Sequence, residues 1–116
     1  MAWFRCSGGS GGAGSNYTDS AWDGSLNENV YIDKTNGQEV AWTGWAATDY
    51  IDIGGQTVIY RGGKISGADY NAWYDSSKAF ISGFGNGSMD TVPQNAKYVR
   101  YSQSASVMTG KIFTEV

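Results

Sequence analysis

The sequence predicts an all-β fold, and three features point to that class. Leucine occurs once, at Leu26, whereas tyrosine occurs 8 times and glycine 17 times in the 116 residues. Strands favour aromatic and β-branched residues, while helices are built mainly from Ala, Leu, Glu, Lys and Arg. From Val30 onward, short apolar runs also alternate with Gly, Asn and Ser turn signals. We expect an antiparallel β-sandwich of the jelly-roll type with about eight strands.

Turn signals divide the chain into these strands. Asn36-Gly37 favours a tight hairpin turn because both residues tolerate positive φ. Within residues 48–53, Tyr50 and Asp52 share one face and Ile51 and Ile53 share the other, as in a strand, and Gly54-Gly55 predicts the turn that follows. The single proline, Pro93, fits an extended entry to a strand. The expected strands are residues 30–33, 38–42, 48–53, 56–61, 70–75, 78–84, 97–102 and 106–116.

The N-terminal part of the chain differs in kind from the rest. Two bulky aromatic residues, Trp3 and Phe4, precede a Gly/Ser run that behaves as flexible coil when free. An apolar tip on a flexible tether is better buried by a partner than by its own domain, because loop closure and ordering oppose folding back. We expect an extended attachment arm and linker at 1–24, followed by the sandwich domain at 25–116. The expected assembly anchor consists of Trp3, Phe4, Arg5 and Cys6.

The residue inventory argues against an enzyme. The chain has no histidine, and Cys6 is its one cysteine, which excludes Ser–His and Cys–His nucleophiles as well as an internal disulfide. Among the 11 Asp and Glu residues, no motif singles out a catalytic pair. We expect no cofactor. A structural calcium ion in the loops at 66–75 or 85–90 is the alternative, since both supply Asp and Asn oxygens.

Charge and hydropathy exclude two further classes of partner. The net charge is −3, and the 8 Lys and Arg residues are scattered instead of forming the basic face that nucleic-acid binders use. No apolar run approaches the roughly 18 residues that span a bilayer, and glycines from position 8 interrupt any signal-peptide core. We expect neither nucleic-acid binding nor membrane insertion, and we expect any export to use another route, such as release inside a larger particle.

A recurring pattern appears in the second half of the chain. It consists of Trp73-Tyr74-Asp75, then Phe80-Ile81-Ser82, then Val92-Pro93 leading through Ala96 and Tyr98 to Arg100. With this pattern, residues 48–116 resemble small jelly-roll modules, galactose-binding-like or carbohydrate-binding-like. Such modules occur in phage tail, baseplate and head-decoration proteins and in gut-bacterial surface proteins. The resemblance implies a sandwich fold used for adhesion, scaffolding or decoration.

Within this pattern, alternation leaves one question open. Tyr98 and Arg100 share one face of their strand, while Val99 and Tyr101 share the other. Either face is a candidate for the core, because a buried tyrosine can satisfy its hydroxyl by a hydrogen bond. Trp73, inside the recognised strand, is expected to be core.

The aromatic residues suggest a carbohydrate site. Sugar-binding modules lay Trp or Tyr rings against pyranose rings, beside a few polar groups that fix the hydroxyls. Trp42 and Trp45 flank a Thr-Gly turn and are suited to presentation near one loop. The alternative is that one or both cap the ends of the core. The candidate glycan platform comprises Trp42, Trp45, Tyr74, Asp75 and Arg100.

These observations lead to one expected function and two alternatives. The leading hypothesis is a non-enzymatic virion protein of a phage or phage-like particle, made in the bacterial cytoplasm and exposed on the particle surface. Its arm would anchor it to other virion proteins and copies of itself, and its sandwich would serve decoration or host adhesion. The first alternative is a free-standing carbohydrate-binding adhesin. The second is a purely structural subunit whose aromatic residues lie in the core or in an interface.

Overall fold

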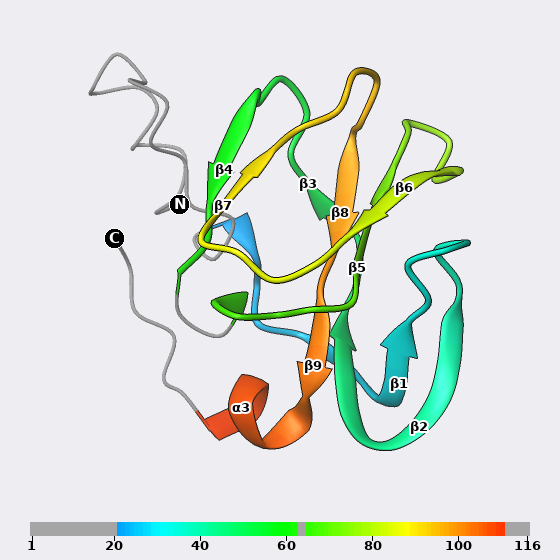
Figure 1. Ribbon diagram of the computed structural model, residues 1–116, viewed down its shortest axis with the longest axis vertical. Coiled ribbons are helices and arrows are strands. Elements are labelled where there is room, and N and C mark those ends of the chain that lie inside the picture. The colour runs from blue at the N-terminus through cyan, green and yellow to red at the C-terminus, as the bar shows by residue number, and fades with distance from the viewer. Residues whose placement is uncertain (1–20, 63–64, 111–116) are drawn as a thin grey trace.

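The computed structural model describes residues 21–62 and 65–110, which form nine strands and one short helix (Figure 1). The prediction of an all-β fold is therefore confirmed. The elements are β1 (Leu26–Ile32), β2 (Glu39–Thr48), β3 (Ile51–Asp52), β4 (Val58–Tyr60), β5 (Asn71–Tyr74), β6 (Phe80–Phe84), β7 (Met89–Thr91), β8 (Tyr98–Arg100), β9 (Ser102–Ser104) and α3 (Ala105–Gly110).

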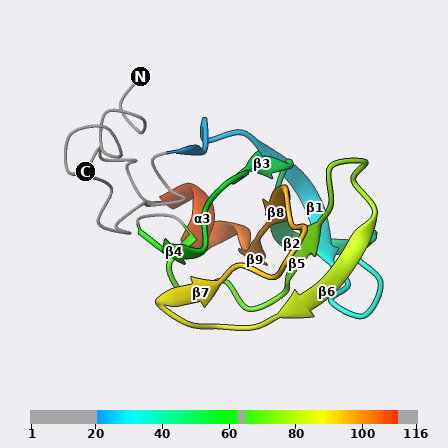
Figure 2. The same ribbon diagram turned by 90° about the horizontal axis from the view of Figure 1, so that it is seen from above.

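The strands form three antiparallel sheets, with the orders β1-β2-β9, β3-β8-β5-β6 and β4-β7. In Figures 1 and 2, the four-stranded sheet lies between the β4–β7 pair and the β1–β2 hairpin. Strands β8 and β9 follow one another through Tyr101, whose carbonyl accepts a hydrogen bond from the Thr48 amide at 2.8 Å. This continuous segment links the four-stranded sheet to the three-stranded one.

The four-stranded sheet is buried on both faces. Trp73 and Val99 belong to one apolar cluster, together with Ile59 of β4 and Met108 of α3. On the opposite face, Ala72, Tyr74 and Tyr98 pack in a second cluster with side chains of β1 and β2. Both faces of the Tyr98–Tyr101 stretch are thus packed, which answers the question that alternation left open. The expectation that Trp73 is core is confirmed.

The predicted hairpin at Asn36-Gly37 joins β1 to β2, but its loop is longer than a two-residue turn. The Asp33 amide donates to the Gln38 carbonyl at 2.8 Å, so residues 34–37 form the loop. Only Gly37 of the dipeptide has positive φ, at 77°. A Cβ on Gly37 would lie 2.6 Å from the Phe80 ring, so the close approach of the loop to β6 also requires glycine.

The prediction of a strand at 106–116 is wrong for its first part, because Ala105–Gly110 form α3. Ser104 precedes the first helical residue, which is the position where serine favours helix initiation. Met108 then reaches the main core from α3. Residues 111–116 lie outside the described residues, as does the predicted anchor Trp3, Phe4, Arg5 and Cys6.

The core also includes a residue from the expected arm. Trp22 is buried in the main apolar cluster, and its indole N–H donates to the Ser25 carbonyl at 2.9 Å. Packing therefore begins before position 25, the start of the domain expected from the sequence. Within residues 21–62 and 65–110, no helix is long and apolar enough to cross a membrane.

Candidate functional site

A wide bulge in β2 carries the two tryptophans of the predicted platform. Glu28 pairs with Ala46, and Val30 pairs with Ala41, so Asn29 alone faces residues 42–45. In a regular strand, residues three apart point to opposite faces. A bulge changes that relation by inserting extra residues on one strand.

Two backbone conformations make this bulge. Asn29 has φ of 61° and Gly44 has φ of 90°, both in the left-handed region that most residues avoid. The Gly44 amide donates to Asn29 Oδ1 at 3.3 Å, which ties the two strands together at the bulge. Asn and Gly are the residue types that tolerate this region best, so the sequence favours the bulge at this position.

The bulge brings the indole rings of both Trp42 and Trp45 into contact with the Tyr31 ring. The Tyr31 ring centroid lies 5.9 Å from that of Trp42 and 6.2 Å from that of Trp45. Tyr70, just before β5, lies 5.5 Å from Tyr31 and 5.3 Å from Trp45. All four contacts are edge-to-face, a favoured arrangement for aromatic pairs.

These four side chains line an open hollow of about 170 Å³, here called the aromatic pocket. The Trp42 side chain is 57% exposed and that of Tyr70 is 36% exposed. Together with Met89, they are the large apolar side chains most exposed in the described part of the chain. Two of these three line one hollow, so the exposure is concentrated and not scattered.

The polar atoms of the pocket rings are free to meet a ligand. Neither the indole N–H groups of Trp42 and Trp45 nor the phenol groups of Tyr31 and Tyr70 hydrogen-bond to another described residue. An apolar hollow with a few polar atoms at its surface is the usual form of a small-ligand site.

A lysine lies beside Tyr70, one of the four pocket residues. The Lys34 ammonium lies 4.8 Å from the centroid of the Tyr70 ring, within the range of a cation–π contact. It also donates to the Asp69 carbonyl at 3.4 Å.

The structure does not bring the other predicted platform residues to this pocket. Tyr74 is buried, and its hydroxyl donates to the Gly37 carbonyl at 2.6 Å; burial raises its pKa to about 12. Arg100 is buried too, donating to the Thr48 carbonyl and pairing with Glu39.

Asp75 has a local role in the turn between β5 and β6. Its Oδ1 accepts hydrogen bonds from the Ser77 amide and hydroxyl and from the Ala79 amide. Backbone and side-chain donors, led by the Ala79 amide, hold the pKa of the Asp75 carboxyl below its usual value. Asp75 therefore caps the turn and is not part of the aromatic pocket.

Sequence reasoning missed Tyr31 and Tyr70. A signal for Tyr31 existed, because it pairs with Val40, two residues before Trp42 and therefore on the same side of the hairpin. Tyr70 carried no such signal, since it reaches the pocket from the residue before β5 by tertiary packing.

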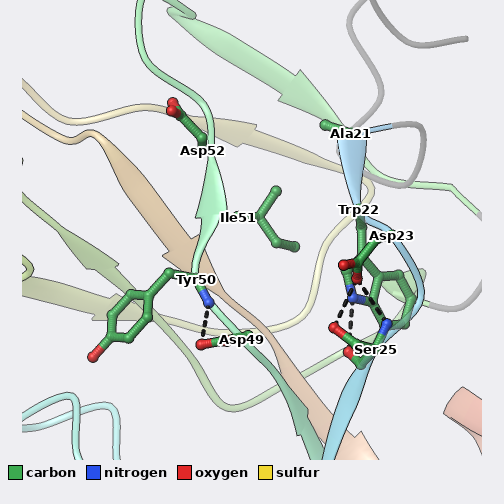
Figure 3. Close-up of a pocket in the computed structure, with 8 residues that line it drawn as sticks. All are labelled: Ala21, Trp22, Asp23, Ser25, Asp49, Tyr50, Ile51 and Asp52. Atoms are coloured by element: carbon green, nitrogen blue, oxygen red, sulfur yellow. Dashed lines mark hydrogen bonds between the residues drawn. The ribbon is translucent and has the colours of Figure 1, made fainter. Parts of the chain in front are cut away.

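A second hollow of about 170 Å³ lies near Trp22, where β3 begins (Figure 3). Its polar groups are largely engaged with near neighbours: Asp23 Oδ1 accepts from the Ser25 amide and hydroxyl, and Asp49 Oδ1 accepts from the Tyr50 amide. As Figure 3 shows, the Tyr50 ring points away from Trp22. Three aspartates line this hollow, and its described lining residues include no cluster of exposed aromatic rings, in contrast to the aromatic pocket.

In the two loops considered for calcium, aspartate side chains already interact with other residues. Asp69 Oδ1 accepts from the Asn86 amide at 3.0 Å, and Asp90 pairs with Arg61 at 2.8 Å. Across the described ranges, no group of three or more His, Cys, Asp or Glu residues is arranged to hold a metal ion.

Comparison with known proteins finds no family model, no curated protein and no solved structure that matches this chain.

Proposed function

We propose that the chain is a non-enzymatic carbohydrate-binding module whose aromatic pocket holds a pyranose ring of a glycan. The observation that carries this proposal is the convergence of Tyr31, Trp42, Trp45 and Tyr70 on one open hollow. Trp42 is 57% exposed, although burial of an indole stabilises a fold by more than that of most side chains. An exposed, clustered aromatic surface is typical of a binding site.

Ring chemistry supports a sugar as the occupant. A pyranose has apolar C–H faces that stack on aromatic rings and hydroxyls around its edge. The two indole N–H groups and two phenol groups of the pocket lack hydrogen-bond partners among the described residues, and hydroxyls suit them. The left-handed Asn29 and Gly44 maintain the bulge before any ligand arrives, which reduces the ordering cost of binding.

The same proposal includes a jelly-roll fold for the domain and its display on a phage or phage-like particle. The resemblance of residues 48–116 supports a jelly-roll module, and the packed antiparallel sheets are consistent with it. Display on a phage or phage-like particle rests on the composition of residues 1–24 and stays a prediction from the sequence.

A glycan array of bacterial surface polysaccharides, followed by calorimetry on the hits, tests the proposal. We expect W42A and W45A each to weaken binding at least about tenfold, the usual effect of truncating a central aromatic contact. M89A is the matched control, because Met89 is also highly exposed, at 52%, but lies in β7, outside the pocket. Its affinity should stay within about twofold of the unchanged protein.

Two results would contradict the proposal. One is an array without any bound glycan. The other is unchanged glycan affinity in W42A and W45A while their mass in solution falls, which would identify the pocket as a contact between copies. Circular dichroism of each variant verifies that the fold is retained.

A further inference from the structure

Lys34 is positioned by glycines in and after β6. A Cβ on Gly83 would overlap the carbonyl oxygen and Cβ of Lys34, so the lysine backbone lies directly against that glycine. A Cβ on Gly85 would lie 3.6 Å from Lys34 Nζ. The lysine stem therefore runs along a strip without side chains and ends over Tyr70.

The Lys34 ammonium has no carboxylate partner among the described residues. The ion pairs found there join Arg61 to Asp90, Lys97 to Asp52 and Arg100 to Glu39. The Asp69 carboxylate lies near the same glycine, since a Cβ on Gly85 would be 3.1 Å from Asp69 Oδ1, but it forms no ion pair with Lys34. Its Oδ1 accepts from the Asn86 amide, and Lys34 contacts the Asp69 backbone carbonyl instead. An ammonium has three donors, and one is used by that carbonyl.

The charge of Lys34 restricts what the aromatic pocket can hold. Four aromatic rings around a hollow would also suit a quaternary ammonium. Here a positive charge lies 4.8 Å from the centroid of Tyr70, one of the pocket rings, and it disfavours a cationic ligand beside it. The same charge attracts an anionic group on a ligand that reaches Lys34.

We propose that the glycan is acidic, with a hexuronate carboxylate bound by Lys34 while a pyranose ring occupies the aromatic pocket. This inference rests on the proposed function and adds the chemical class of the sugar. Lys34 then acts as the residue that determines specificity, and the aromatic rings supply affinity that does not depend on charge.

The test uses polysaccharides in matched pairs. Polygalacturonate, alginate and a glucuronan are each compared with their carboxyl-reduced forms, in which every uronate becomes the neutral hexose of the same configuration. Affinity electrophoresis measures binding of the full chain, of K34Q and of K78Q. Lys78 is the matched control because its ammonium also lies over tyrosine rings, 4.9 Å from Tyr50 and 5.4 Å from Tyr98, but away from the pocket.

For at least one pair, we expect the acidic form to bind at least fivefold more tightly than its reduced form. K34Q should abolish that preference while keeping its affinity for the reduced form, and K78Q should keep the preference. Equal binding of acidic and reduced forms, or a preference that survives in K34Q, would overturn this inference and leave the carbohydrate function standing. If the protein binds none of these polysaccharides, the inference of an acidic glycan is also overturned. If the glycan array shows no bound glycan either, the proposed carbohydrate-binding function is overturned as well.

Discussion

Asn29 and Gly44 face each other across the β1–β2 ladder, both with positive φ, joined by a 3.3 Å hydrogen bond from the Gly44 amide to Asn29 Oδ1. Because of this pair, Asn29 alone stands opposite residues 42–45. The relationship sets the spacing of the aromatic pocket, since Trp42 and Trp45 contact the same tyrosine only when the strand bulges between them.

Substitution of Asn29 should separate its two contributions. N29G keeps access to the left-handed conformation but loses the side-chain hydrogen bond, whereas N29A loses the bond and adds backbone strain. We expect N29A to lower the free energy of unfolding by about 1–2 kcal/mol more than N29G does. Urea unfolding of both variants measures the difference. Equal stability would mean that backbone conformation at position 29 does not maintain the bulge.

Gly83 should be intolerant of any side chain. Its Cβ would overlap Lys34, so G83A must displace the 34–37 loop or bend β6. We expect a loss of about 1–3 kcal/mol, the usual cost of overpacking. G87A is the control, because a Cβ there would meet its nearest atom at 3.7 Å, an ordinary contact. Its stability should lie within about 0.5 kcal/mol of the unchanged protein.

The Arg61–Asp90 ion pair should be the most sensitive polar contact. The two side chains are 0% and 7% exposed, and Asp90 also accepts from the Tyr101 hydroxyl at 2.9 Å. Arg61 in addition donates to the Ala68 and Gly85 carbonyls. R61M leaves a buried carboxylate without its cation, so we expect a loss of about 3–5 kcal/mol.

Two comparisons verify this explanation. K97M removes the cation of the exposed Lys97–Asp52 pair, whose side chains are 39% and 57% exposed, and should cost less than about 1 kcal/mol. The double variant R61M/D90N should be destabilised by less than the sum of its single changes, since no buried charge is left. Additive losses in urea unfolding would contradict a coupled pair.

The sequence predicted what depends on local pattern. Alternation at 50–53 correctly placed Ile51 and Ile53 in the core. Trp42 and Trp45 were chosen as a pair from their spacing and do line one hollow, but the Thr-Gly turn expected between them is a bulge within the continuous strand β2. The prediction failed where long-range packing decides. Tyr74 and Arg100 are polar residues that β1 and β2 cover from the other side of the sheet, which no spacing within β5 or β8 indicates.

The C-terminal error has a similar cause. The β-branched Val107 and Thr109 favour a strand at this position. The serine before Ala105 and the glycine at 110 were the competing signals for a short helix. Burial of Met108 against the main core favours the helix.

The Glu39–Arg100 pair should make stability depend on pH in the acid range. The hydrogen bond from the Arg100 guanidinium is the main cause that holds the pKa of Glu39 below its ordinary value of 4.5, against an opposing effect of burial. The folded state therefore takes up this proton at lower pH than the unfolded chain does. The resulting stabilisation is complete above the unfolded pKa and is lost as pH falls through the folded pKa.

E39Q removes this titration while keeping an oxygen that Arg100 can approach. The stability difference between the unchanged protein and E39Q should be constant from pH 7 to about 5 and should shrink below about 4.5. E28Q is the control, because Glu28 is exposed and makes none of the ion pairs found among the described residues. Thermal unfolding followed by circular dichroism at half-unit pH steps measures all three proteins. A stability difference between the unchanged protein and E39Q that stays constant down to pH 3 would show that ionisation of Glu39 contributes nothing to folding. The pair would then serve only to position Arg100, whose guanidinium carbon lies 4.8 Å from the centroid of the Tyr50 ring.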